Sequence, residues 1–289
     1  MLRKLIIIAA MAMVSLSSTS PHAWATSPGA NGWLAYVDEN EQLTLVLPDG
    51  SREHEITSFA IGKFVENPQF SANGHWIVFE VNDGGTTDLY VIRTDGSHRH
   101  RITHTRDRYE WGPSWSPDGR SIVFSKNGFA VPSPIVAIDR DGTHRRRIGH
   151  VTGEFPRYPP NGSRIAYGGS DGEIHVMHAD GTHDVILTET GNNNYPDWSP
   201  DGRLIAFIRG RHFSRHQVWI MRADGTHDRR VTTTRRPNFL GVFSPNGKQI
   251  AYTSETLTPI RVTHLDGTQR HRVGGTLIGD FGVSWQARP

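Results

Sequence analysis

The stretch Pro196-Asp197-Trp198-Ser199-Pro200-Asp201-Gly202 recurs almost unchanged as Pro113-Ser114-Trp115-Ser116-Pro117-Asp118-Gly119. Weaker copies lie at 68–74, 156–162 and 241–247. A second signature, Asp-Gly followed by Ser or Thr, occurs six times at intervals of 46, 46, 39, 44 and 42 residues, beginning at Asp49, Asp95, Asp141, Asp180, Asp224 and Asp266. Such a period indicates a repeat architecture.

The repeat that covers residues 195–232 shows what one unit contains. Four short runs, at 195–199, 204–208, 217–221 and 229–232, have the composition of strands. Pro-Asp-Gly joins the first two runs and Ala-Asp-Gly joins the last two. Both are hairpin signals, because Gly adopts positive φ freely and Asp tolerates it. Four antiparallel strands in about 40 to 45 residues predict a propeller blade.

The two ends of the chain set the expected number of blades. The first unit lacks its first strand and opens on Gly32 to Val37, whereas the C-terminus supplies an extra first strand over 281–285. Pairing of these two strands would close the ring and remove an exposed edge. We therefore expect an all-β, six-bladed β-propeller of four-stranded antiparallel blades over residues 31–289, with the C-terminal strand completing blade one.

The succession P-x-W-S-P-D-G, I-A-F and I-x-x-M-x-A-D-G-T-H resembles the PD40, or TolB-type, WD40-like propeller family over residues 31–289. The resemblance implies the propeller fold. For function it implies a non-catalytic binding scaffold outside the cytoplasm. TolB has an α/β domain ahead of its propeller, for which residues 26–30 leave no room, so we expect the propeller alone.

The first 25 residues have the features of a secretory signal peptide. Arg3 and Lys4 precede a run of twelve residues, 5–16, that is apolar apart from Ser15, and the segment ends in Ala23-Trp24-Ala25. Twelve residues are too few to span a bilayer, which requires about 20. We expect cleavage before Thr26 and a periplasmic or secreted protein with no membrane span.

The composition excludes several classes of protein. The absence of Cys excludes a disulfide scaffold, a thiol nucleophile and a cysteine zinc site. Removing Arg3 and Lys4 with the signal leaves 29 Lys+Arg against 29 Asp+Glu, so we expect no nucleic-acid binding. Gly168-Gly169-Ser170-Asp171-Gly172 matches the letters of a nucleophile elbow but is interpreted as a hairpin turn. We therefore assign no catalytic residue and no cofactor.

The segments that lead into each first strand carry the candidate binding residues. Each brings a carboxylate or amide, and five of the six bring an adjacent aromatic residue. The repeat would gather them at the mouth of the central channel, on the face with the longer loops. There the acids could focus a negative potential, hold Ca²⁺ or receive a basic segment of a partner. The set is Glu66, Glu110, Trp111, Glu154, Phe155, Asn194, Tyr195, Asn238, Phe239 and Asp280.

Two other surfaces are candidates for binding. The loop 209–216 is basic and places Phe213 between Arg211 and Arg215, as a recognition element or as a solvated loop. Runs of Arg and His at 98–101, 144–147, 229–230 and 270–272 lie on the expected outer strands. They would block edge-to-edge aggregation or bind a polyanion.

The leading interpretation is a monomeric scaffold for a protein or peptide partner in the cell envelope. One alternative is a glycan-active enzyme, a lyase or hydrolase, that uses two mouth carboxylates about 5 to 9.5 Å apart as acid and base. Another is a polyanion-binding protein that uses the Arg-rich rim. For the mouth residues, the structural alternative is that the acids cap strand ends or pair with Arg, and that the aromatic residues belong to the core.

Overall fold

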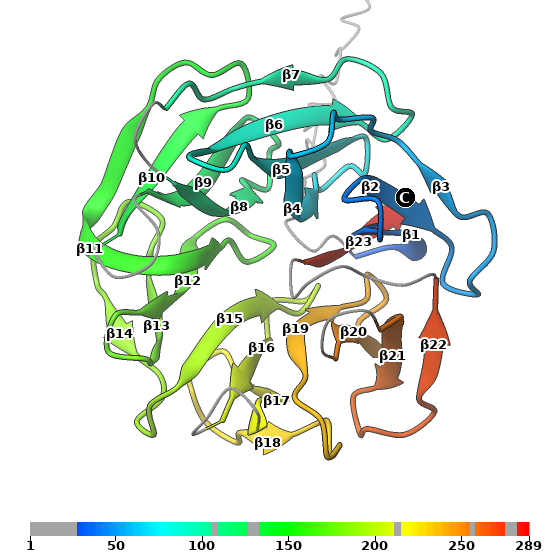
Figure 1. Ribbon diagram of the computed structural model, residues 1–289. Helices are drawn as coiled ribbons and strands as arrows, with labels where there is room; N and C mark the ends of the chain where they lie inside the picture. Colours follow the sequence, from blue (N-terminus) through cyan, green and yellow to red (C-terminus); the bar gives the residue numbers. More distant parts are fainter. Residues whose placement is uncertain are drawn as a thin grey trace, which may run out of the picture.

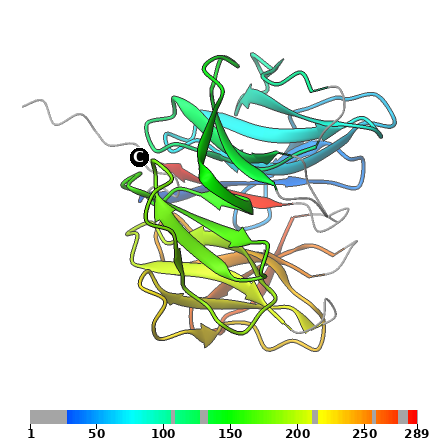
Figure 2. The same ribbon diagram turned by 90° about the vertical axis from the view of Figure 1, so that its left-hand side faces the viewer.

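The described residues form a propeller of antiparallel sheets around a central axis (Figure 1). The computed structural model describes residues 28–105, 109–126, 133–210, 215–254, 258–274 and 282–288. These ranges contain strands and turns but no α-helix. Within them no helix has the length and apolar character needed to cross a membrane. Seen from the side, the strands run between two opposite faces, where the connecting turns lie (Figure 2).

Four of the sheets have four strands each. The first contains β23 (Val283–Arg288), β1 (Ala30–Val37), β2 (Leu43–Val46) and β3 (His54–Glu55). The second contains β4 (Phe64–Phe70), β5 (Trp76–Asn82), β6 (Thr87–Arg93) and β7 (His100–Arg101). Another contains β15 (Asn193–Trp198), β16 (Leu204–Arg209), β17 (Gln217–Arg222) and β18 (Arg229–Arg230). The last contains β19 (Phe239–Phe243), β20 (Gln249–Thr253), β21 (Ile260–His264) and β22 (His271–Val273).

The remaining strands form one seven-stranded sheet, so the expected six four-stranded blades are wrong: four such blades are present, not six. In order from one edge, its strands are β14 (Val185–Ile186), β13 (Ile174–His178), β12 (Arg164–Gly169), β11 (Arg146–Arg157), β10 (Pro134–Asp139), β9 (Ser121–Lys126) and β8 (Glu110–Trp115). The long strand β11, of 12 residues, joins the two halves.

The continuity of β11 has a local cause. Its first part pairs with β10, with Thr152 opposite Pro134, and its second part pairs with β12, with Gly153 opposite Gly169. Residues 148–153 contain neither Pro nor an Asp-Gly turn, and the chain passes from one ladder to the other through an irregularity at Gly149, whose φ is +58°. The interval of 39 residues between Asp141 and Asp180, the shortest of the five, spans this connection.

The C-terminal strand pairs with the first strand of the chain. Leu34 lies opposite Trp285 and Tyr36 lies opposite Val283 in the antiparallel ladder between β1 and β23. Both ends of the chain therefore contribute to one sheet, and β1 does not present an open inner edge.

Apolar residues of each sheet pack against the neighbouring sheet. Tyr36 of β1 belongs to one buried cluster with Val262 of β21, and Leu45 of β2 belongs to another with Phe79 of β5. These side chains are inaccessible to solvent, so the core lies between the sheets and holds them around the axis.

The six Asp-Gly-Ser/Thr turns use the Asp side chain as expected. In each turn the Asp Oδ1 atom accepts the backbone N–H of the residue two positions later, at 2.9–3.0 Å. The next residue then takes a left-handed backbone conformation; these residues are Arg52, His98, His144, His183, His227 and Gln269. The four turn histidines are therefore part of the hairpin geometry.

Candidate functional site

Each innermost strand has a residue with positive φ where it approaches the axis, and in the first sheet this residue directly precedes β23. These residues are Asn67, Gly112, Phe155, Tyr195, Leu240 and Gly282. In β4, β8, β11, β15 and β19 the register shifts at this residue, so each of these strands has a bulge there. Two positions after four of these bulges, the residues line one cavity; they are Gln69, Arg157, Asp197 and Val242.

The inner strands enclose a small cavity at the level that follows the bulges. A cavity of about 20 Å³ lies there, enough for about one water molecule. Its lining comprises Gln69, Arg157, Tyr195, Pro196, Asp197, Leu240, Gly241, Val242 and Val283. Residues from several inner strands therefore meet around one small cavity at this depth.

Arg157 is the main polar group on the axis. Its buried guanidinium donates Nη1 hydrogen bonds to the carbonyl oxygens of Gly112 (2.9 Å), Pro113 (3.3 Å) and Pro156 (3.1 Å). Burial lowers the pKa of Arg157 to about 10, against the opposing effect of the nearby carboxyls of Asp197 and Glu80. Arg157 thus ties the bulges of β8 and β11 together.

Glu66 and Glu80 form a buried carboxyl pair near Arg157. They lie opposite each other on β4 and β5, and are 5% and 0% exposed. Glu80 Oε1 accepts the Gly112 N–H (2.6 Å) and the Asn67 side-chain amide (2.9 Å). The Oε2 atom of each carboxyl is buried without a hydrogen-bond partner in the described part of the chain.

Burial controls the protonation of this pair. It raises the pKa of Glu66 to about 7. Burial also raises the pKa of Glu80 well above its usual value, an effect strengthened by the nearby Glu66 carboxyl and opposed by the hydrogen bonds from Gly112 and Asn67. The pair therefore holds at least one proton at neutral pH.

A second group of predicted residues meets where the inner strands β8, β11 and β15 begin their approach to the axis. The rings of Phe155 and Tyr195 lie 4.2 Å apart, and Trp111 stacks on Tyr109 at 6.1 Å. Glu154 is half-buried beside them; burial raises its pKa, partly offset by a hydrogen bond from Asn194. A carboxyl, an amide and aromatic rings are thus brought together on the inner strands β11 and β15.

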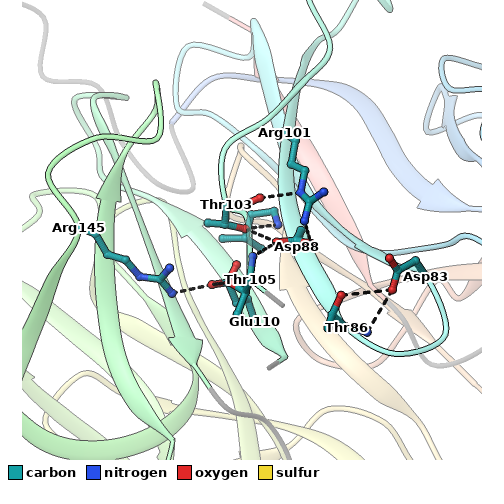
Figure 3. A network of polar contacts seen from close by, with 9 residues as sticks. Asp83, Thr86, Asp88, Arg101, Thr103, Thr105, Glu110 and Arg145 are labelled. Carbon is teal, nitrogen blue, oxygen red and sulfur yellow. Dashed lines mark hydrogen bonds and ion pairs between the residues drawn. The ribbon is translucent and has the colours of Figure 1, made fainter. Parts of the chain in front are cut away.

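The structure places Glu110 and Asn238 inside the sheets. Glu110 is fully buried, and its Oε1 atom accepts hydrogen bonds from Thr105 Oγ1 (2.8 Å) and Arg145 Nη2 (2.6 Å), as Figure 3 shows. The same figure shows Arg101 bound to Asp88 in the neighbouring sheet.

Asn238 is fully buried as well, and its amide donates to Gln217 Oε1 (3.0 Å) and Thr234 Oγ1 (2.6 Å). Phe239, next in the chain, is 2% exposed and belongs to the core. The structural alternative, in which the acids and amides anchor strand ends, therefore describes this part of the predicted set.

Several predicted residues lie outside the described ranges. They are Asp280, Arg211, Phe213 and the signal segment 1–25. Arg215 is described and is exposed.

Sequence reasoning missed Glu80, Arg157 and Asp197. The available signal was a charged residue within an otherwise apolar strand, as in Trp76-Ile77-Val78-Phe79-Glu80-Val81. A charge at such a position needs a buried partner or a proton.

The Gly168–Gly172 motif forms a hairpin turn between β12 and β13, as expected. His175 lies beside it, with Nε2 3.1 Å from both carboxylate oxygens of Asp171 and Nδ1 3.1 Å from Asp184 Oδ2. In a catalytic triad Nε2 would face the serine hydroxyl, but here it faces a carboxylate. Over the described ranges, no three His, Asp or Glu side chains are grouped closely enough to hold a metal ion.

Comparison with known proteins agrees with this architecture. The sequence pattern of the TolB beta propeller domain family (PD40) matches residues 129–276. The chain belongs to that family. It is 30% identical over 139 residues to the uncharacterized protein Atu1656 of Agrobacterium fabrum, covering 42% of this chain and 47% of that protein. It is 30% identical over 162 residues to a TolB homolog of Chlorobium chlorochromatii, covering 54% of this chain and 35% of the homolog.

The chain therefore spans about half or less of the length of these relatives. Among solved structures, TolB from Acinetobacter baumannii superimposes with a TM-score of 0.74 at 21% identity, covering 89% of this propeller and 67% of that chain. An oligogalacturonate lyase in complex with manganese superimposes with a TM-score of 0.55 at 13% identity, covering 88% and 77%. At these identities the likeness concerns the fold alone.

Proposed function

We propose that this TolB-family propeller is an exported, non-catalytic binding protein whose channel mouth receives a basic segment of a protein or peptide partner in the cell envelope. The observation that carries the proposal is the burial of two carboxyls on inner strands, Glu66 and Glu154, which we assign to the mouth. Their pKa values are raised by burial, and neither forms a salt bridge with a described Lys or Arg.

A basic side chain from a partner would offset this desolvation. A guanidinium or ammonium group near a buried carboxylate favours its charged form and makes a charge-assisted hydrogen bond. The faces of Tyr195 and Trp111 offer cation–π contacts of about 0.5 to 2 kcal/mol. The Asn194 amide, which already bonds Glu154, could orient the incoming group.

The alternative of a polyanion-binding rim has less support. Several outer-strand arginines are bound by their own chain: Arg101 to Asp88, Arg145 to Glu110, and Arg229 through a 2.7 Å hydrogen bond to the Leu265 carbonyl. These guanidinium groups form ion pairs or hydrogen bonds that connect strands and neighbouring sheets. The support for the glycan-active alternative is the likeness of fold to the oligogalacturonate lyase.

The proposal is tested by cross-linking capture of a partner from the cell envelope. In the double variant Glu66→Gln, Glu154→Gln a neutral amide replaces each of the two carboxyl groups that would attract the cation. The amount of captured partner should therefore fall roughly tenfold or more. An excess of an oligoarginine peptide should release the partner from the wild-type protein, and an oligoglutamate peptide should not.

The matched control is Glu55→Gln, which removes an exposed carboxyl on the outer strand β3. It should capture the partner as the wild type does. Equal capture by a folded double variant, or release by oligoglutamate, would remove the acidic mouth as the binding surface.

A further inference from the structure

The outer strands of the sheets carry charged or imidazole side chains at two equivalent positions, with one exception. The equivalent pairs, aligned by their register with the preceding strand, are His54–Glu55, His100–Arg101, Arg146–Arg147, Arg229–Arg230 and His271–Arg272. In β14 the pair is Val185–Ile186, opposite Val176 and His175. Val185 and Ile186 are 55% and 53% exposed.

Among the residues that the structure describes, no strand pairs with the outer side of β14. β14 is the last strand of the seven-stranded sheet and lies at the rim of the molecule (Figure 1). The Leu187 N–H donates to the Ile174 carbonyl at 2.8 Å. Because successive residues of an antiparallel ladder alternate in direction, the N–H and C=O of Ile186 point away from β13, towards the open edge.

Such an edge is normally protected by charge. Lys, Arg or Glu on an edge strand prevents another strand from adding to it. Glu55, Arg101 and Arg230 occupy the position of Ile186 in other sheets of this molecule. β14 lacks this protection and combines free backbone groups with two exposed apolar side chains.

The surroundings of β14 are acidic. Residues 171–190 contain no Lys or Arg and five acids, Asp171, Glu173, Asp180, Asp184 and Glu189. The whole chain, in contrast, has 31 Lys+Arg and 29 Asp+Glu. Asp180, Asp184 and Glu189, which flank the strand, are exposed. The edge is thus complementary to a basic segment rather than to an acidic one.

We propose that β14 is a docking edge for an extended segment of a partner protein in which apolar residues alternate with Lys or Arg. The segment adds as a further strand of the sheet. Main-chain hydrogen bonds to Ile186 provide affinity. The apolar side chains, which all lie on one face of the added strand, pack beside Ile186, and the basic side chains reach the flanking acids. This surface is separate from the channel mouth, so either proposal can fail without the other.

The test uses the full-length protein and a fluorescein-labelled, N-acetylated peptide, Lys-Val-Lys-Val-Lys-Val-Lys. Fluorescence anisotropy should show binding to the wild type that weakens as the salt concentration rises. Ile186→Lys, which places a charge where the other sheets have one, should weaken binding roughly tenfold or more. Glu189→Lys should also weaken it, and the acidic peptide Glu-Val-Glu-Val-Glu-Val-Glu should not bind.

The matched control is Arg230→Ile, which gives β18 the apolar residue of β14, while Arg222 and Arg229 offset the acids Asp224 and Asp228 beside it. It should bind the basic peptide as the wild type does, with no second site. Hydrogen exchange should show protection of the Ile186 amide when the peptide is bound.

Three results would overturn the proposal. The first is unchanged peptide affinity in Ile186→Lys. The second is an Ile186 amide that stays unprotected in the saturated complex. The third is a wild-type dimer that Ile186→Lys converts to a monomer, since the edge would then be occupied by a second copy of this chain.

Discussion

At the scale of single residues, the buried Glu66 carboxyl makes stability depend on pH. Burial raises the pKa of Glu66 from its usual value of 4.5 to about 7 in the folded state. The folded protein therefore binds more protons than the unfolded chain between these values, so stability falls as the pH rises through that window. The shift corresponds to about 3 kcal/mol at most, because one pKa unit is worth about 1.4 kcal/mol.

Glu66→Gln should remove this component of the pH dependence. The variant should gain stability relative to the wild type when both are unfolded in urea at about pH 8, and gain much less at about pH 5. Glu55→Gln, on an exposed carboxyl, should leave the profile unchanged. Parallel pH profiles for wild type and Glu66→Gln would show that the carboxyl is not desolvated.

The acidic and amide residues of the inner strands show what could and could not be predicted from the sequence at this scale. Glu66 and Glu154 could be selected because they precede a recognisable strand of the repeat. Glu110 and Asn238 satisfied the same pattern but lie two positions before the positive-φ residue, whereas Glu66 and Glu154 lie one position before it. These residues therefore differ in their position relative to the bulge, and the spacing of motifs alone did not locate the bulge.

At the scale of elements, the bulge of β8 requires glycine at position 112. Gly112 has φ +59°, and a Cβ atom there would lie 2.6 Å from Phe155 Cδ1 and 2.8 Å from Phe155 Cα in the adjacent inner strand. Gly112→Ala should therefore destabilise the protein through its backbone conformation, by about 1 to 2 kcal/mol, and through the clash, by about 1 to 3 kcal/mol more.

Gly119→Ala separates these two effects. Gly119 has φ +66°, but nothing lies within 4 Å of a Cβ atom there. The substitution should cost only the backbone component, about 1 to 2 kcal/mol, when the two variants are compared by urea unfolding. Equal destabilisation by the two substitutions would mean that the bulges of β8 and β11 do not pack closely.

Prediction of the elements was most accurate where turn chemistry is explicit. The Asp-Gly hairpins correctly located the turns, since their geometry depends on residues that are adjacent in sequence. The partition into sheets was wrong at β11, because continuity depends on whether 148–153 keeps bonding first to β10 and then to β12. Tertiary pairing of this kind is visible in the sequence only as a shortened repeat.

At the scale of the whole molecule, the pairing of β23 with β1 should be essential for stability. A chain ending at Gly282 would lose Val283 and Trp285 from the cluster that includes Tyr36 and Val262. It would also expose the inner edge of β1. Loss of these contacts should lower stability by several kcal/mol, which corresponds to about 10 °C or more in a thermal unfolding curve.

A circular permutant provides the matched control, because Ala30 lies opposite Arg288 in the antiparallel ladder. An Asn-Gly linker between these two residues would form a hairpin, and new termini could be placed between Gly84 and Gly85, where both residues are exposed and a Cβ atom would meet nothing within 4 Å. The permutant keeps every strand and should melt within about 5 °C of the wild type. If the shortened chain melted as late as the permutant, the sheets would be held by inter-sheet packing alone and closure by β23 would contribute little.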